Sequence, residues 1–201
     1  MTNAFASQNY AQQLQRLSTD EGLSQNYVVK IQEDEIGYIW IATQQGLNRF
    51  DGYNVETFDG GFDLDKHYIF TVLKTQDGKL LVSTDIAGAY LIDPQTLKTE
   101  KIYSGQLDKE KQIYSPVSAM AEKNELYYLA IDNQIVTYNK ITGAFTQTAA
   151  LAEKTSFIRA LTLHNNTLFI GANNGLYTLN LVSNQLTEIP LHSVEHTTID
   201  N

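Results

Sequence analysis

Short apolar bursts separated by polar turns run along this chain, and the same arrangement returns four times. Each unit holds a strand-like burst, a polar or small turn, a shorter alternating stretch that ends in Asp or Asn, and then a more polar stretch. The end residues are Asp51, Asp93, Asn139 and Asn180. They recur about every 40–45 residues, a period typical of β-propeller blades. The pattern therefore predicts a repeated, blade-like sheet.

A further strand opens each unit, and its apolar positions match from unit to unit. The matching pairs are Val28 and Ile31, Ile69 and Val72, Val117 and Met120, and Ile158 and Leu161. The bursts are rich in Ile, Val, Tyr, Phe and Thr, which suit a pleated surface, and the turns between strands hold the Asp-Gly and Asn residues of tight hairpins. We therefore predict an all-β fold of about four blades, each with four antiparallel strands, over residues 17–58, 67–103, 113–149 and 156–190. In the first unit, Trp40 and Ile41 are expected to fill space between blades.

The composition limits the classes of partner. Hydrophobic residues make up 42% of the 201 residues, which indicates a globular chain with a sizeable core. The formal net charge of −9 repels phosphate backbones and anionic lipid, so nucleic acid and membrane surfaces are not expected partners. The absence of cysteine excludes disulfides, thiol catalysis and zinc-thiolate sites. No apolar run approaches the roughly 18 residues of a membrane helix, so a membrane link would come only from a segment downstream.

The two ends of the sequence fall outside the four units. Ala4-Phe5-Ala6 has the A-x-A form that signal peptidase prefers, so residues 1–16 are interpreted as a leader remnant and lead-in. Residues 191–201 are interpreted as the start of a further, truncated blade.

The first unit carries a longer ordered motif than the others. It reads Leu17-Ser-Thr-Asp-Glu-Gly-Leu-Ser-Gln-Asn26, then Gly37-Tyr-Ile-Trp-Ile-Ala-Thr43 and Gly46-Leu-Asn-Arg-Phe-Asp-Gly52. Across residues 17–58 this string resembles the two-component-regulator propeller repeat, found in periplasmic sensor regions of hybrid histidine kinases and of some diguanylate cyclase receptors. The later units depart from it, although the fourth recovers Gly171-Ala-Asn-Asn-Gly-Leu176.

The resemblance implies a non-catalytic, periplasmic, ligand-sensing module of a transmembrane signalling receptor. In that family a β-sandwich domain, a membrane helix and a cytoplasmic kinase or cyclase domain follow the propeller. Its rings usually have about seven blades, so residues 17–190 are expected to form an open arc of a larger ring. An open arc exposes the flanks of its first and last blades, and these flanks are expected to favour self-association.

In a propeller, the loops between blades and the turns between second and third strands gather on one rim, where ligands commonly bind. The rim candidates are Gln44, Gln45, His67, Tyr68, Asp85, Tyr114, Asp132, Asn133, Asn173 and Asn174. Their amide, carboxylate and aromatic groups suit a small polar ligand or an oligosaccharide. The alternative is that these are ordinary turn residues.

Metal and catalytic chemistry find little support in the sequence. Asp59, Asp63 and Asp65 offer oxygen ligands at a spacing that could hold calcium, but the glutamate and glycine of an EF-hand loop are missing, so an acidic surface loop is the interpretation. The histidines His67, His164, His192 and His196 are scattered over different segments. We therefore predict no metal and no cofactor. A propeller enzyme acting on polysaccharide and a protein-binding scaffold remain alternative functions, because fold does not fix function.

Overall fold

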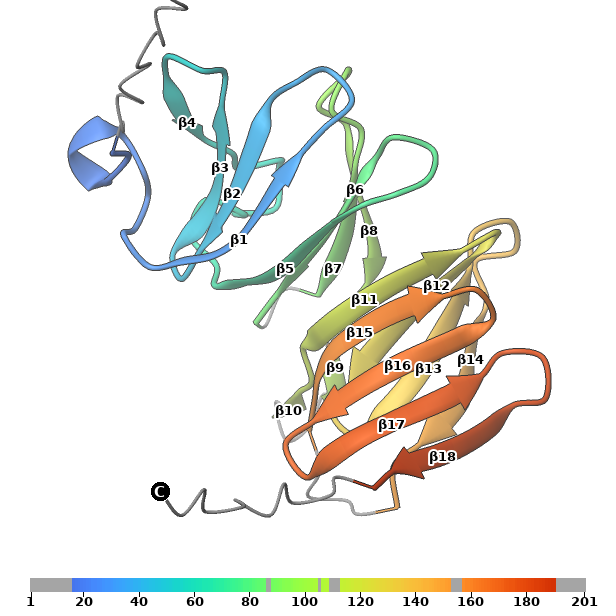
Figure 1. Cartoon of the computed structure of the whole chain (residues 1–201). Coiled ribbons are helices and arrows are strands. Elements are labelled where there is room, and N and C mark those ends of the chain that lie inside the picture. Colours follow the sequence, from blue (N-terminus) through green and yellow to red (C-terminus); the bar gives the residue numbers. More distant parts are fainter. Residues whose placement is uncertain (1–15, 86–87, 105, 109–112, 153–156, 191–201) are drawn as a thin grey trace, which may run out of the picture.

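The computed structural model describes residues 16–85, 88–104, 106–108, 113–152 and 157–190. The leader-like stub and residues 191–201, with His192 and His196, lie outside these ranges. Within them the chain folds into four four-stranded antiparallel sheets, a two-stranded ribbon and one short 3-10 helix, η1 (Thr19–Glu21) (Figure 1). The prediction of an all-β arc of four blades is confirmed.

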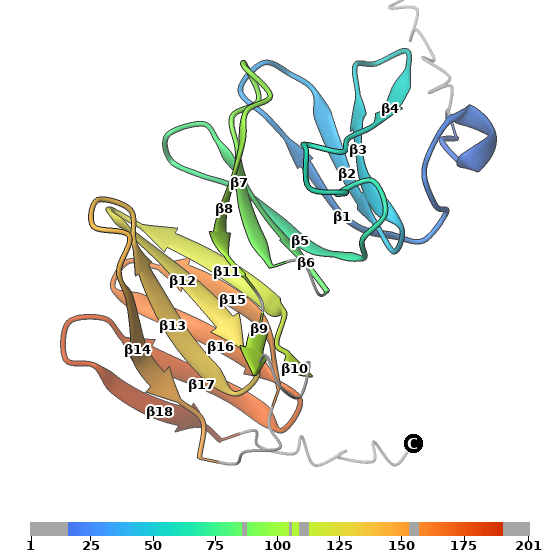
Figure 2. The same cartoon turned by 180° about the vertical axis from the view of Figure 1, so that it is seen from behind.

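Each blade runs in strict chain order from its first to its fourth strand. The first two blades consist of β1 (Val28–Glu33), β2 (Ile39–Thr43), β3 (Gly46–Phe50) and β4 (Val55–Thr57), and of β5 (Ile69–Lys74), β6 (Leu80–Thr84), β7 (Ala89–Ile92) and β8 (Thr99–Tyr103). The last two consist of β11 (Val117–Lys123), β12 (Leu126–Ile131), β13 (Gln134–Asn139) and β14 (Phe145–Ala150), and of β15 (Ile158–His164), β16 (Thr167–Ala172), β17 (Gly175–Asn180) and β18 (Gln185–Ile189). The first strands β1, β5, β11 and β15 lie innermost, each in contact with the next (Figures 1 and 2).

A small ribbon between the second and third blades was not predicted. It pairs β9 (Gln106–Asp108) with β10 (Ile113–Tyr114), antiparallel and with an irregular register. Residues 113 and 114, which the pattern placed at the start of the third unit, therefore belong to this ribbon, and the sheet of the third blade begins at Val117.

The repeat of Asp or Asn at the end of each third strand has a direct structural cause. In every blade this side chain accepts hydrogen bonds from the backbone N–H groups two and three residues further on, which closes the turn to the fourth strand. The acceptor oxygens and their distances are Asp51 Oδ1 at 2.8 and 2.6 Å, Asp93 Oδ1 at 2.9 and 3.1 Å, Asn139 Oδ1 at 2.9 and 2.9 Å, and Asn180 Oδ1 at 2.9 and 3.0 Å. Asp and Asn are interchangeable here because both present the same acceptor oxygen.

The stabilisation that these turns contribute should depend on pH only in the first two blades, where the acceptor is an aspartate. Backbone hydrogen bonds, chiefly from Asn54 and Thr96, lower the pKa values of Asp51 and Asp93 below the ordinary value. Since the folded pKa is depressed, the stabilisation is present above the unfolded pKa of about 3.9 and is lost as the pH falls through the folded value. Carboxyl titration by NMR should give midpoints below about 3.9 for both residues. Midpoints at or above that value would contradict the turn geometry. Asp51→Asn should keep the turn, as Asn139 does, and remove its acid sensitivity.

The hydrophobic core lies between the blades. Buried side chains form three clusters, one at each junction of consecutive blades. At the first junction Trp40 is fully buried and packs with Leu47 against Ile69 and Leu80 of the second blade. The predicted role of Trp40 as an interblade filler is confirmed, and each blade shields an apolar face only through its neighbour.

At each end of the arc, one sheet face of the terminal blade has no neighbouring blade among the described residues (Figure 1). On the first blade Ile31 is 59% exposed, whereas its counterpart Val72 on the second blade is buried. Part of this face is covered by the segment after η1, where Leu23 is buried and Ser24 donates its backbone N–H to Asn48 Oδ1 at 2.9 Å. Self-association through these flanks stays a prediction.

Candidate functional site

One rim of the arc is built by a recurring backbone hydrogen bond. The N–H of the first turn residue after the second strand donates to the carbonyl of the aromatic residue just before the first strand. The pairs are Gln44 to Tyr27 at 3.2 Å, Asp85 to Tyr68 at 3.1 Å, and Asn173 to Phe157 at 3.0 Å. The turns and the interblade loops therefore do lie together on one rim.

Four of the ten predicted rim residues make side-chain contacts that hold the rim itself together. His67 Nδ1 lies 3.4 Å from Asp85 Oδ1, which links an interblade loop to the adjacent turn. Asn133 Nδ2 donates to Leu151 O at 2.9 Å, and Asn173 Oδ1 accepts from the N–H of Phe157 at 2.7 Å. These contacts are those of ordinary turn residues.

The remaining candidates do not converge on one another. Gln44, Gln45 and Asn174 are exposed, and the ring of Tyr68 packs against Phe70 with centroids 4.7 Å apart. The side chain of Tyr114 lies outside the described part of the structure. Asp132 accepts the Ser115 hydroxyl at 2.6 Å and also lines a pocket, together with Phe70, Phe157 and Arg159.

The first strand of every blade contains a β-bulge at the same place. Its register skips one residue between Val28 and Lys30, between Ile69 and Thr71, between Val117 and Ala119, and between Ile158 and Ala160. The bulged residues are Val29, Phe70, Ser118 and Arg159. A bulge leaves its residue outside the regular pairing and redirects the side chain, and bulges are common beside functional sites.

The four bulged residues all line one cavity at the centre of the arc. This hub cavity, about 460 Å³ in volume, is bounded by β1, β5, β11 and β15, and its lining includes Lys30, Thr71, Met120 and Thr162. A second pocket of about 300 Å³ adjoins it on the rim side and shares three of the bulged residues, Phe70, Ser118 and Arg159. Hub and rim are therefore connected through the bulges.

The rim-side pocket combines two aromatic rings with opposite charges. The guanidinium of Arg159 lies 5.9 Å from the ring centroid of Phe157, and no carboxylate within the described ranges pairs with it. Asp132 adds a carboxylate to the lining of this pocket. Ser118 Oγ donates to Ile158 O at 2.6 Å, which ties the third blade to the fourth. Stacking faces beside one cation and one carboxylate suit a polar ring compound.

Sequence reasoning missed Phe70, Ser118 and Arg159 as site residues, although a signal was present. The matched apolar pairs in the first strands are three residues apart, whereas regular strands place every second residue on one face. A spacing of three on one face requires an extra residue between, and that residue is the bulge.

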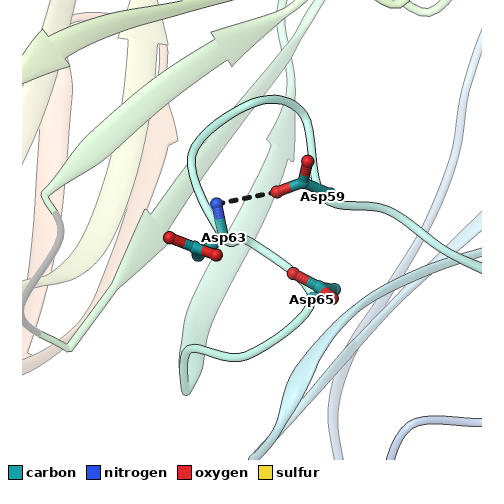
Figure 3. Close-up of side chains that lie close together, drawn as sticks. All are labelled: Asp59, Asp63 and Asp65. Carbon is teal, nitrogen blue, oxygen red and sulfur yellow. Dashed lines mark hydrogen bonds between the residues drawn. The ribbon is translucent and has the colours of Figure 1, made fainter.

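The acidic loop after β4 gathers three carboxylates. One oxygen from each of Asp59, Asp63 and Asp65 lies within 4.8 Å of the others (Figure 3). Asp59 Oδ1 accepts the N–H of Asp63 at 2.9 Å, and the Lys66 ammonium, 2.5 Å from Asp63, lowers the pKa of that carboxyl. Calcium takes six to eight oxygen ligands, and two of these three carboxylates already have protein partners.

No helix among the described residues has the length and apolar character that a membrane crossing requires.

Comparison with known proteins finds a family likeness in the first blade. Residues 22–45 match the family model described as two component regulator propeller. Over 38 residues the chain is 45% identical to a Formosa agariphila protein named Histidine kinase P4, covering 19% of this chain and 3% of that protein.

Two solved structures from B. thetaiotaomicron share the fold. One is the extracellular domain assigned to a hybrid two component system, with a TM-score of 0.71 and 23% identity over 88% of this chain and 26% of that chain. The other is the extracellular domain assigned to a one component system, with a TM-score of 0.69 and 22% identity over 84% of this chain and 23% of that chain. The chain is thus similar to the two component regulator propeller family over residues 22–45, and its fold is similar to that of these extracellular domains.

Proposed function

We propose that the chain is a non-catalytic, ligand-sensing propeller module of a bacterial transmembrane signalling receptor, located in the periplasm. The family repeat in the first blade and the likeness to extracellular domains of signalling systems support this proposal. The chain spans about a quarter of the length of those domains.

The observation that carries the ligand-binding part is the common lining of the hub cavity by four equivalent bulges. Each bulged residue stands outside the regular pairing of its strand, so its side chain can differ from blade to blade. Different side chains at one structural position give the hub apolar, aromatic, hydroxyl and guanidinium groups. A small polar ligand, such as a mono- or oligosaccharide, binds in the hub cavity with its ring on Phe70 and its polar groups on Arg159, and it reaches Phe157 through the adjoining rim-side pocket.

The test begins with a thermal-shift screen of the 201-residue chain against mono- and oligosaccharides, amino acids and nucleotides. A ligand at one hundred times its Kd stabilises the folded chain by about 2.7 kcal/mol, which is readily seen as a rise in Tm. For the best hit, Arg159→Met and Phe157→Ala should each weaken binding about tenfold or more, a loss of roughly 1.4 kcal/mol. Tyr53→Ala is the matched control, since Tyr53 is 92% exposed and lies in the β3–β4 turn.

The alternatives give different results in the same experiment. Chemical conversion of the hit would favour the propeller enzyme. Binding that is unchanged in both Arg159→Met, which alters the hub cavity, and Phe157→Ala, which alters the adjoining rim-side pocket, would overturn this site. A screen without any hit would favour the protein-binding scaffold.

A further inference from the structure

A second cavity lies away from the hub, in the wedge between the second and third blades. This interblade groove, about 330 Å³ in volume, is lined by Asp77, Lys79, Leu91, Glu100, Ile102, Glu125, Tyr127, Tyr138 and Lys140. It shares no residue with the hub cavity or the rim-side pocket.

The groove contains a buried hydroxyl that has no hydrogen-bond partner. Tyr127 is only 1% exposed, and its phenolic oxygen makes no hydrogen bond within the described ranges. The hydroxyl of Thr75 acts on this phenol and lowers its pKa, but its own proton is donated to Asp77 Oδ1 at 2.6 Å. A buried polar group without a partner costs about 1–3 kcal/mol, so the phenol needs an explanation beyond packing.

The equivalent positions in the other blades show that packing does not require this phenol. Tyr127 lies on the second strand, four residues before its end, and faces the preceding blade. Leu80 on the second blade and Leu168 on the fourth occupy the same place, and both are fully buried. A leucine therefore fills the junction, whereas the tyrosine adds a hydroxyl directed at a cavity.

The charged side chains that line the groove include more carboxylates than ammonium groups available to pair with them. Lys140 Nζ is held by Glu122 Oε1 at 2.7 Å and lies 5.3 Å from the centre of the Tyr127 ring. Lys79 is within 3.6 Å of Asp77. Glu100 and Glu125 form no ion pair in the part of the chain that the structure describes. Both lysines are thus engaged, and two carboxylates at the mouth are available to a cation.

We propose that the interblade groove binds a small organic ammonium compound, with its ammonium group at Glu100 and Glu125, its hydrocarbon part on Leu91 and Ile102, and a polar group at the phenol of Tyr127. The site is independent of the hub cavity. Burial raises the pKa of Tyr127, and the carboxylates of Asp77 and Glu122 raise it further, so the phenol stays neutral and serves as a hydrogen-bond donor or acceptor.

The test is calorimetric titration of the 201-residue chain with 1,5-diaminopentane and, as a second amine, spermidine. 1,5-Pentanediol has the same chain without charge, and glutarate has it with the opposite charge. Binding of the diamine, weakened by added salt and absent for the diol and glutarate, is the expected result, since the attraction is between charges at the surface.

Three variants locate the site. Glu100→Gln removes an exposed charge and should weaken diamine binding about fivefold or more, while Glu188→Gln, an exposed glutamate on the fourth blade, should leave it unchanged. Tyr127→Phe removes only the hydroxyl, so it should weaken binding and leave the Tm of the free protein unchanged or raised, since an unpaired buried group is lost.

The opposite results would overturn the proposal. These are no diamine binding, equal binding to wild type and to both groove variants, or tighter binding of glutarate. A Tm lowered by several degrees in Tyr127→Phe would also count against it, because the hydroxyl would then have a structural partner.

Discussion

Replacing Trp40 by alanine is expected to lower the free energy of unfolding by about 4 kcal/mol, within the range for truncating a buried tryptophan. The side chain is fully buried at the first junction and meets Phe58 edge to face, with ring centroids 5.0 Å apart. Its truncation leaves a cavity between two sheets that cannot close without moving both.

The substitution also removes a hydrogen bond, which adds to the cost of the cavity. The indole Nε1–H of Trp40 donates to Asp34 Oδ2 at 2.7 Å, while Asp34 Oδ1 accepts from the N–H groups of Ile36, Gly37 and Tyr38. Asp34 is itself buried, so the substitution leaves one carboxylate oxygen without its donor. The β1–β2 turn is organised around this carboxylate and should loosen as well.

Urea unfolding followed by circular dichroism measures the effect, since Trp40 is the only tryptophan and its fluorescence is lost with it. Tyr53→Ala, an aromatic truncation at an exposed turn, should change stability by less than about 0.5 kcal/mol. A loss below about 1 kcal/mol for Trp40→Ala would mean that the first junction is not the packed interface described above.

Lys140→Met should destabilise the chain by about 3 kcal/mol, because it leaves the carboxylate of Glu122 buried without its cation. The side chain of Glu122 is 4% exposed; one oxygen accepts from Lys140 at 2.7 Å and the other from the N–H of Gln76 at 2.6 Å. The carboxylate therefore connects the third blade to the β5–β6 turn of the second, and the lysine supplies the only charge within hydrogen-bond reach among the described residues.

A double-mutant cycle distinguishes the interaction free energy of Glu122 and Lys140 from other destabilising effects of the substitutions. Glu122→Gln combined with Lys140→Met removes both charges and should recover a large part of the loss. Lys98→Met removes an exposed lysine and should have an effect below about 0.5 kcal/mol. If the double variant is as unstable as the sum of the two single variants, Glu122 and Lys140 are not coupled.

The period, the strand order and the interblade role of Trp40 were predictable because residues of the same type recur at fixed spacings along the sequence. Every blade repeats an Asx turn, a polar first turn and a largely apolar second strand, and each of these has a local physical cause. The β9–β10 ribbon was not predictable in this way, since it occurs once and departs from the period.

The candidate binding sites were harder to predict from the sequence than the fold. Polar residues at turns, such as Asp85 and Asn173, indicate binding and turn formation equally well, and their hydrogen bonds show turn formation. Phe70 and Arg159 escaped notice because strand residues are judged by alternation, which a bulge interrupts. Tyr127 resembles any other strand tyrosine until its hydroxyl is seen to lack a partner.

The bulge in the first strand of every blade separates the residues that determine packing between blades from one residue whose identity varies. Side chains on either side of it fix how neighbouring sheets stack, whereas the bulged position tolerates valine, phenylalanine, serine and arginine in a single chain. Single substitutions at the bulged positions, one per blade, can therefore change which ligands the hub cavity selects. The packing of the blades stays the same.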